Sequence, residues 1–382
     1  MIYFDNAATS WPKPPRVKEA MVRFMDEIGA NPGRSGHLLS IEAARVLHEA
    51  REALSICFNV KDSSRIVFTH NATESVNLAL KGLLKPKDHV ITSSIEHNSV
   101  MRPLRDLEKK GIELSVIPCS EKGQLDPQEM EKKIRSNTRM LVLNHASNVT
   151  GALLPIREVG QIARKHNLFF LVDAAQTAGA YPIDMEEDRI DLLAFTGHKS
   201  LYGPQGTGGL VLGVRVKEKK MVPLKQGGTG SRSEFEEQPD FLPDRFESGT
   251  PNSVGIAGLL AGIRFVLEKG IEQIRKHEIS LIKKLINGLK EFPEVRLYGP
   301  ENGLGRTATL SFNIAHLSPS EVAFRLEREF GVLCRPGLQC APAAHRTIGT
   351  FPEGTVRFSL SYFNSEEHVD QALQAVSSLL RE

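Results

Sequence analysis

The chain has 382 residues, and its 48 basic and 46 acidic side chains leave a formal net charge of only +2. Apolar residues make up 40% and charged residues 25% of the sequence, as in an ordinary soluble globular protein. The near-neutral charge excludes the electrostatic footprint of a nucleic-acid-binding protein, and no stretch approaches the roughly 18 consecutive apolar residues that span a bilayer. The length favours two domains.

The amino terminus and the cysteine content both indicate a reducing compartment. The first six residues, Met-Ile-Tyr-Phe-Asp-Asn, contain neither the basic nor the apolar region of an export signal. The cysteines are too few for a disulfide framework in a chain of this length: Cys57, Cys119, Cys334 and Cys340. We therefore expect a cytoplasmic protein, and most simply an enzyme.

Short, apolar, β-branched runs alternate with amphipathic stretches through the first half of the chain. Apolar residues at helical spacing from Ile156 to Ala163 predict one of the intervening helices. Nearly continuous apolar strands separated by helices are typical of a mainly parallel sheet that is covered on both faces. The runs that predict strands lie at 66–68, 90–92, 114–117, 140–143, 169–172 and 192–195.

The second half of the chain changes character at Lys217. From there to Ser253 the sequence is polar and rich in Gly and Pro, which predicts an extended loop or an interface arm. Apolar periodicity then predicts a smaller α+β domain of roughly 125 residues. Its expected elements are a helix over 271–289, strands at 308–312 and 355–359, and a last helix over 372–379.

Polar residues gather where the predicted strands end, which is where an open α/β sheet binds its ligands. Asp173 ends one strand, and Lys199 follows the end of another, just before a glycine-rich stretch. Residues 69–75, Thr-His-Asn-Ala-Thr-Glu-Ser, precede a helix, and the free N–H groups of such a helix start favour a phosphate. A lysine for a Schiff base, an aspartate for the pyridine nitrogen and a phosphate cup are what pyridoxal phosphate (PLP) requires.

Each of these features taken alone has a simpler interpretation. An aspartate at a strand end can cap a helix, a lysine after a histidine can lie on the surface, and Thr-Glu-Ser can be a plain helix cap. Their order along the chain favours the cofactor site.

The motifs resemble those of the fold-type I PLP enzymes of the class V aminotransferase superfamily, and within it the group II cysteine desulfurases and selenocysteine lyases. The resemblance covers essentially the whole chain. Its motifs are Tyr-Phe-Asp-Asn-Ala-Ala at 3–8, Arg-Ser-Gly-His at 34–37, Glu-His-Asn at 96–98, Ser-Asn-Val-Thr-Gly at 147–151, Val-Asp-Ala-Ala-Gln at 172–176, Thr-Gly-His-Lys at 196–199, Tyr-Gly-Pro at 202–204, Arg-Pro-Gly-Leu-Gln-Cys-Ala-Pro at 335–342 and Val-Arg-Phe-Ser at 356–359.

The resemblance implies an α/β protein with two domains. A large PLP-binding domain at 16–255 would be built on a mainly parallel seven-stranded sheet. A smaller α+β domain would comprise 1–15 and 256–382 and carry the Cys340 loop.

The resemblance also implies roles around the cofactor. Lys199 would bind PLP covalently and then move the Cα proton of the substrate, and His97 would stack on the ring. The other cofactor contacts would be Asp173 to the pyridine nitrogen, Gln176 to the phenolic oxygen, Asn148 beside the ring, and Ala72, Thr73, Thr196 and His198 around the phosphate, with Thr250 reaching in from the second subunit of a homodimer.

For the substrate, the resemblance implies that Arg357 binds the carboxylate, because the planar fork of an arginine matches a carboxylate. Asn148 would assist it, and Arg335 and His37 would also contribute to substrate binding. No metal site is expected.

Cys340 distinguishes among the reactions of this superfamily. A transaminase needs only the lysine and a carboxylate site, whereas a desulfurase also needs a thiolate that attacks the substrate sulfur and ends as a persulfide. Cys340 follows Arg335 by five residues, and a nearby cation lowers the pKa of a thiol. Leu338 and Gln339 stand where related enzymes often carry histidines, so the residue that protonates the thiol stays open.

The leading hypothesis is an L-cysteine desulfurase that forms L-alanine and passes sulfur from Cys340 to an acceptor protein. The alternatives are a selenocysteine lyase, a transaminase or epimerase in which Cys340 is incidental, and a non-catalytic PLP-binding protein. Cys57 and Cys119 are expected to be buried and inert. Cys334 could instead pair with Cys340 in a disulfide or share a metal with it, although no metal-binding motif accompanies them.

Overall fold

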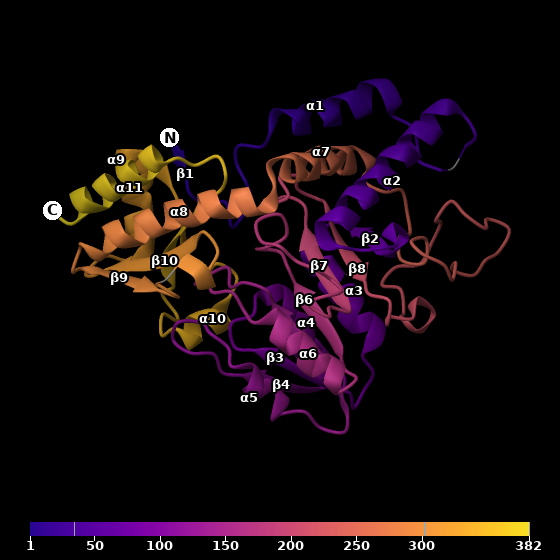
Figure 1. Cartoon of the computed structure of the whole chain (residues 1–382), viewed down its shortest axis with the longest axis horizontal. Coiled ribbons are helices and arrows are strands. Elements are labelled where there is room, and N and C mark those ends of the chain that lie inside the picture. The colour runs from indigo at the N-terminus through magenta and orange to yellow at the C-terminus, as the bar shows by residue number, and fades with distance from the viewer. Residues whose placement is uncertain (34, 302, 382) are drawn as a thin grey trace.

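The computed structural model describes residues 1–33, 35–301 and 303–381, so Arg34 of the 34–37 motif lies outside the described residues. Figure 1 shows a large sheet with its helices on one side of the molecule and a smaller sheet, which includes β9 and β10, on the other. Both chain termini lie at the smaller unit.

The large sheet has seven strands in the order β2-β8-β7-β6-β5-β3-β4. Six strands run in the same direction and β8 alone runs the opposite way, so the sheet is mainly parallel, as predicted. The central strands β5 to β8 are buried almost throughout, which explains their continuous apolar runs. The strands are β2 (Ile66–Thr69), β3 (His89–Ser93), β4 (Glu113–Ile117), β5 (Thr138–Asn144), β6 (Phe169–Asp173), β7 (Leu192–Thr196) and β8 (Gly208–Leu212).

The apolar pattern misses β8, because this strand begins inside the glycine-rich stretch with Gly208 and Gly209. A Cβ on Gly208 would lie 2.8 Å from the Cα of Asn71, and a Cβ on Gly209 would lie 2.5 Å from the ring of Phe195. These contacts are closer than carbon atoms tolerate, so the two glycines allow the strand to pass between β2 and β7.

Helices cover both faces of the large sheet, and alternate strand residues face the two layers. Leu141 and Phe170 pack in the cluster that includes α2, α6 and α7, whereas Val142 and Leu171 pack with α3 and α4. Helix α1 lies against α7 (Figure 1). The helices are α1 (Pro15–Arg23), α2 (Leu38–Phe58), α3 (Ala72–Leu83), α4 (Asn98–Glu108), α5 (Pro127–Glu131), α6 (Ile156–Lys165) and α7 (Ser253–Lys269).

The smaller unit is an antiparallel sheet in the order β12-β13-β10-β9, packed against α8, α9 and α11. The predicted strands and helices of this α+β unit are present, and β1 adds the amino terminus by pairing with β11. The domain limits at 16 and 255 stay predictions. The elements are β1 (Ile2–Tyr3), α8 (Ile271–Lys290), β9 (Val295–Tyr298), β10 (Thr309–Ile314), α9 (Pro319–Phe330), β11 (Val332–Leu333), β12 (Arg335–Gly337), α10 (Pro342–Thr347), β13 (Thr355–Ser359) and α11 (Glu366–Leu379).

The polar segment that begins at Lys217 is an extended loop, as predicted. Residues 217–252, all of which are described, contain a single 3-10 turn at Glu218–Lys220 and no strand or longer helix. Within the described ranges, no helix is long and apolar enough to cross a membrane.

The loop between β5 and α6 joins the two units. Ser311 Oγ donates to the carbonyl of Val149 (2.7 Å), and the Thr307 amide donates to that of Gly151 (2.8 Å). The buried guanidinium of Arg306 donates to the carbonyl oxygens of Pro300, Thr150 and Thr309. The small sheet therefore fixes the loop that carries Asn148.

Two glycines with nearly equal backbone conformation allow this junction to be tested. Gly151 has a φ of +72° and a Cβ there would lie 2.3 Å from the Thr309 carbonyl oxygen, whereas Gly349 has a φ of +73° with nothing within 4 Å. Alanine at either position incurs a backbone cost of about 1–2 kcal/mol. Because of the added clash, we expect Gly151→Ala to lower the free energy of unfolding by at least about 2 kcal/mol more than Gly349→Ala, measured by urea denaturation. Equal losses would contradict a rigid junction.

Candidate active site

A cavity of about 210 Å³ lies where β3, β5, β6 and β7 end, bounded on its other side by β12 and β13 of the small sheet. Most of the predicted site residues line this cavity, although their individual roles stay predictions. They are Ala72, Thr73, His97, Asn148, Asp173, Gln176, Thr196, His198, Lys199, Arg335, Cys340 and Arg357.

Asp173 is the last residue of β6 and is only 4% exposed. Burial raises its pKa, and this is opposed by hydrogen bonds from the Ala175 amide (2.9 Å) and Ser99 Oγ (3.0 Å) and by the charge of Lys199. Ser99 is a site residue that the motifs do not indicate. Its only signal in the sequence is its position two residues after His97, at the start of a helix.

His97 caps α4, and its Nδ1 accepts a hydrogen bond from the Ser99 amide (3.0 Å). Burial, followed by the charge of Lys199, lowers the pKa of His97 to about 3, so the ring is neutral at neutral pH. A neutral ring in this position can lie against a flat ligand without burying a charge.

Lys199 follows β7 by three residues and reaches the same cavity. Burial lowers its pKa to about 8, and the charges of Arg357 and Arg335 add to this effect while Asp173 opposes it. Its Nζ has no hydrogen-bond partner among the described residues. An amine with a lowered pKa is the form that reacts with a carbonyl carbon.

The start of α3 provides a place for an anion. Asn71 caps the helix by accepting from the Glu74 amide (2.9 Å), which leaves the Ala72 and Thr73 amides without acceptors among the residues described. His198 Nδ1 is also buried in this cavity, with no hydrogen-bond partner among those residues. Together with Lys199 and Asp173, these unpaired groups fit the phosphate and the ring of PLP.

Arg335 on β12 lies directly opposite Arg357 on β13. Like charges in this cross-strand arrangement repel each other, so an anion between them is favoured. Arg357 Nη2 is 2.6 Å from Asp5 Oδ1, and its Nη1 donates to the Asn148 carbonyl (3.1 Å). Asp5, which the motif analysis does not assign to the site, therefore serves as the counter-ion of the predicted substrate-binding arginine.

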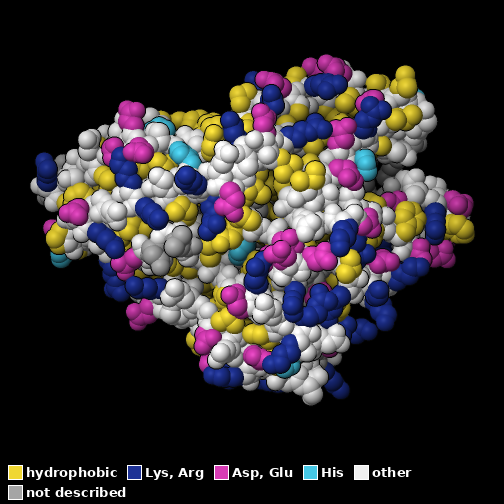
Figure 2. Space-filling model, in the orientation of Figure 1, with side chains coloured by type: hydrophobic (Ala, Val, Ile, Leu, Met, Phe, Trp, Pro, Cys, Tyr) yellow, Lys and Arg dark blue, Asp and Glu magenta, His cyan; other side chains and the backbone are white. Residues whose placement is uncertain are grey.

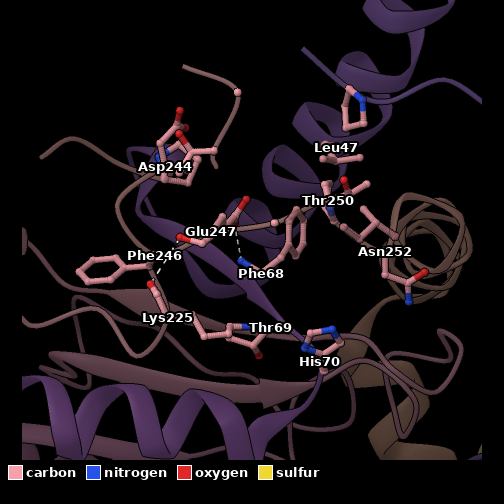
Figure 3. A pocket seen from close by; sticks show the side chains of 18 of the residues that line it. Leu47, Phe68, Thr69, His70, Lys225, Asp244, Phe246, Glu247, Thr250 and Asn252 are labelled. Atoms are coloured by element: carbon pink, nitrogen blue, oxygen red, sulfur yellow. Dashed lines mark hydrogen bonds between the residues drawn. The ribbon is translucent and has the colours of Figure 1, made fainter. Parts of the chain in front are cut away.

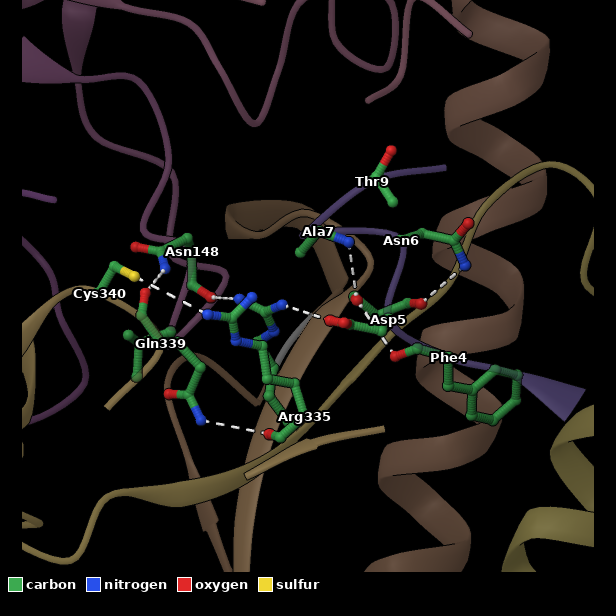
Figure 4. A network of polar contacts seen from close by, with 12 residues as sticks. Phe4, Asp5, Asn6, Ala7, Thr9, Asn148, Arg335, Gln339 and Cys340 are labelled. Atoms are coloured by element: carbon green, nitrogen blue, oxygen red, sulfur yellow. Dashed lines mark hydrogen bonds and ion pairs between the residues drawn. The ribbon is translucent and has the colours of Figure 1, made fainter. Parts of the chain in front are cut away.

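The four cysteines are all free thiols, which excludes the alternative of a disulfide between Cys334 and Cys340 in this structure. Burial raises the pKa of Cys57 and of Cys334 to about 12 and that of Cys119 to about 11, although Cys119 and Cys334 are only partly buried. Cys340 is instead exposed at the cavity, with Sγ 3.8 Å from Arg335 Nη2 (Figure 4). No group of three or more metal-binding side chains occurs in the part of the chain that the structure describes.

Two predicted site residues lie outside this cavity of their own chain. His37 is exposed and caps α2, with Nδ1 accepting from the Ser40 amide (3.2 Å). Thr250 lies with Leu47, Phe68 and Asn252 on the wall of a second cavity, of about 330 Å³ (Figure 3). The roles assigned to His37 and Thr250 stay predictions.

Comparison with known proteins gives consistent matches over the whole chain. A protein of Pyrococcus abyssi named a probable cysteine desulfurase is 36% identical, with 100% of this chain and 94% of that protein covered. The structure of a cysteine desulfurase from Thermococcus onnurineus NA1 superimposes with a TM-score of 0.92 at 36% identity, covering 100% of this chain and 94% of the other. The structure of the cysteine desulfurase CsdA from Escherichia coli superimposes with a TM-score of 0.89 at 28% identity, covering 99% of this chain and 94% of the other.

The family model described as aminotransferase class-V matches residues 2–372. This match spans nearly the full length of the chain and includes every residue that lines the cavity. The chain therefore belongs to the class-V aminotransferase family.

Proposed function

We propose that the protein is a PLP-dependent cysteine desulfurase, which converts L-cysteine into L-alanine and retains the sulfur as a persulfide on Cys340. The observation that carries this proposal is an exposed thiol, 3.8 Å from a guanidinium, at the same cavity as Lys199 and Asp173. Relatives named cysteine desulfurases that match along the whole chain support it.

The residues around the cavity fit PLP. Asp173 would lie at the ring nitrogen, and Thr73 and Thr196 would lie at the phosphate. Gln176 would lie at the phenolic oxygen, with its side-chain amide oriented by a hydrogen bond to the Ala7 carbonyl (3.1 Å). When bound, the cofactor supplies an electron-withdrawing ring that makes the Cα–H bond of an amino acid acidic.

Arg357 is suited to bind the substrate carboxylate. Asp5 and the Asn148 carbonyl occupy its two Nη atoms, while its Nε is buried and has no partner among the described residues. A carboxylate that accepts from Nε would also lie between the two opposed arginines. Lys199, with a pKa of about 8, can then take the Cα proton as a neutral amine and return it as an ammonium ion.

Cys340 would take the sulfur in a balanced substitution. Its thiolate attacks the substrate sulfur, an S–S bond forms, and the Cβ–S bond breaks with its electron pair passing to carbon, which takes up a proton to give alanine. The guanidinium of Arg335 lies 3.8 Å from the attacking Sγ atom. Because Cys340 is exposed, an acceptor protein can reach the persulfide. The four free thiols suit the reducing environment of the cytoplasm.

The proposed function is tested by removing the thiol. Cys340→Ala should lose desulfuration of L-cysteine by at least about 100-fold, equivalent to about 2.7 kcal/mol of barrier lowering, measured as alanine formed per minute. It should still bind PLP, because none of the cofactor contacts involves sulfur. Cys334→Ala is the matched control and should keep wild-type activity. An active Cys340→Ala variant would favour the lyase or transaminase alternatives, and retained turnover of selenocysteine alone would favour selenocysteine lyase.

The lowered pKa of Lys199 predicts how the protein takes up its cofactor. Since the folded-state pKa lies below the ordinary value of about 10.5, the reactive neutral amine should predominate above pH 8. We expect the rate of borohydride-reducible PLP attachment to the cofactor-free protein to rise with pH to a midpoint near 8. Asp173→Asn should move the midpoint lower, because the carboxylate raises the pKa of Lys199. A midpoint near 10 would show that the amine is not buried as described.

We further propose that a second copy of the chain covers the face around Thr250. This residue lies near the end of the polar segment 217–252, at a cavity that its own Lys199 does not line. Large apolar side chains are exposed on the same segment and at the first residue of α2, with Phe235 60% and Leu38 80% exposed. Figure 2 shows hydrophobic side chains at the end of the molecule where α1 and the start of α2 lie. A homodimer would bury them and bring Thr250 to the partner's phosphate site.

Mixing two inactive variants tests whether the sites are shared. Lys199→Ala removes the lysine and Thr250→Val removes the hydroxyl. If Thr250 acts across the dimer, each mixed dimer holds one complete site, so random re-association should restore about a quarter of wild-type activity. Each variant refolded alone is the control. No recovery after mixing, in samples where mass spectrometry detects the mixed dimer, would contradict shared sites.

A further inference from the structure

The loop that carries Cys340 has an unusual backbone conformation. Gln339 and Cys340 are consecutive residues with φ values of +41° and +59°, in the left-handed region that residues other than glycine seldom adopt. Such conformations persist only where the surrounding structure holds them.

The carbonyl groups of both residues are bound by the large unit. Asn148 Nδ2 donates to the Gln339 carbonyl (2.7 Å), and the Asn98 amide, at the start of α4, donates to the Cys340 carbonyl (3.0 Å). Figure 4 shows Asn148, Gln339 and Cys340 together at this point. These contacts fix the position of the loop, but other groups must stabilise its left-handed backbone conformation.

The side chain of Gln339 supplies those groups. It is 4% exposed, and its Nε2 donates to the carbonyls of Thr355 (2.8 Å) and Arg335 (3.3 Å). Its Oε1 accepts from His345 Nε2 (2.8 Å) and also lies 3.4 Å from the hydroxyl of Thr355. The amide therefore uses all of its hydrogen-bonding capacity, and it ties the loop to β12, β13 and α10.

His345 has a single hydrogen-bonding arrangement. Because Gln339 Nε2 faces two carbonyls, its Oε1 faces the ring, and His345 Nε2 must carry the proton. His345 Nδ1 then accepts from the hydroxyl of Thr350 (2.7 Å). The ring is fully buried, and burial lowers its pKa to about 4, so it stays neutral. The Nε2 proton is committed to Gln339 and is not available to the thiol.

We infer that Gln339, held by His345, is a positioning residue for Cys340. The pair keeps the loop in the left-handed conformation that presents Sγ beside Arg335 at the cavity. An amide does not titrate, so the residue that stands before the cysteine in this chain orients the thiol and does not exchange a proton with it. This inference rests on the proposed function. It gives Gln339 a part in sulfur transfer although the Gln339 side chain does not touch the reacting sulfur atoms.

The test separates sulfur transfer from the chemistry at Cα. Gln339→Met keeps the length of the side chain and removes every polar contact, and Gln374→Met, at an exposed position on α11, is the matched control. With the PLP-loaded protein, we expect Gln339→Met to form the Cys340 persulfide from L-cysteine at least about 10-fold more slowly than wild type. Exchange of the Cα hydrogen of L-alanine with deuterated water, which depends on Lys199, should stay within about twofold of wild type.

A second pair of variants guards against a general folding defect. His345→Leu removes the donor to Gln339 and should show the same split, whereas His345→Gln retains an Nε2 donor and should restore most of the persulfide rate. Parallel loss of both reactions in Gln339→Met, or an unchanged persulfide rate, would overturn the inference.

Hydrogen exchange distinguishes failure of this inference from failure of the proposed function. Backbone amides of residues 335–349 should exchange at least about 10-fold faster in Gln339→Met than in wild type, whichever reaction the protein catalyses. If wild type forms no persulfide, the proposed function fails. Unchanged exchange in the loop would then overturn the positioning role independently.

Discussion

Buried charge around the cavity is the constraint on which the rest of the site depends. Asp173 and Arg357 are 4% and 2% exposed, and a charge removed from water to this extent must be paired and hydrogen-bonded. Asp173 is supported by Ser99, by the Ala175 amide and by Lys199, while Arg357 is supported by Asp5 and the Asn148 carbonyl. These partners come from the amino terminus, the start of α4 and the segments after β5, β6 and β7, so satisfying the charges brings distant segments to one cavity.

The cavity combines groups from both units, and Asn148 connects them. Its carbonyl accepts from Arg357, and its side-chain amide donates to the carbonyl of Gln339. Asn148 therefore joins Arg357 to the loop that carries Cys340. The loop that carries Asn148 is itself fixed by Ser311 and Arg306 of the smaller unit. A change at the junction is thus expected to alter the position of the thiol as well as that of Arg357.

Much of this arrangement follows from the sequence, because apolar periodicity and residue order are local signals. Six strands of the large sheet and the residues at their ends were predictable in this way, whereas β8 was not, because its glycines are required by Asn71 and Phe195 across the sheet. Contacts between residues far apart in the chain carry no such signal. Asp5 pairs with Arg357 across 352 positions, and the neutral state of His345 depends on burial that only the packed α10 produces.

The proposed function requires that Cys340 receive sulfur from L-cysteine at the Lys199 cavity. Incubating the PLP-loaded protein with L-cysteine labelled with heavy sulfur, and mapping the label by mass spectrometry under non-reducing conditions, measures this transfer. We expect one labelled sulfur atom on the peptide that contains Cys340, lost on treatment with a thiol, with one alanine formed for each persulfide. Alanine formation with the label on Cys334, or with no labelled cysteine, would contradict it.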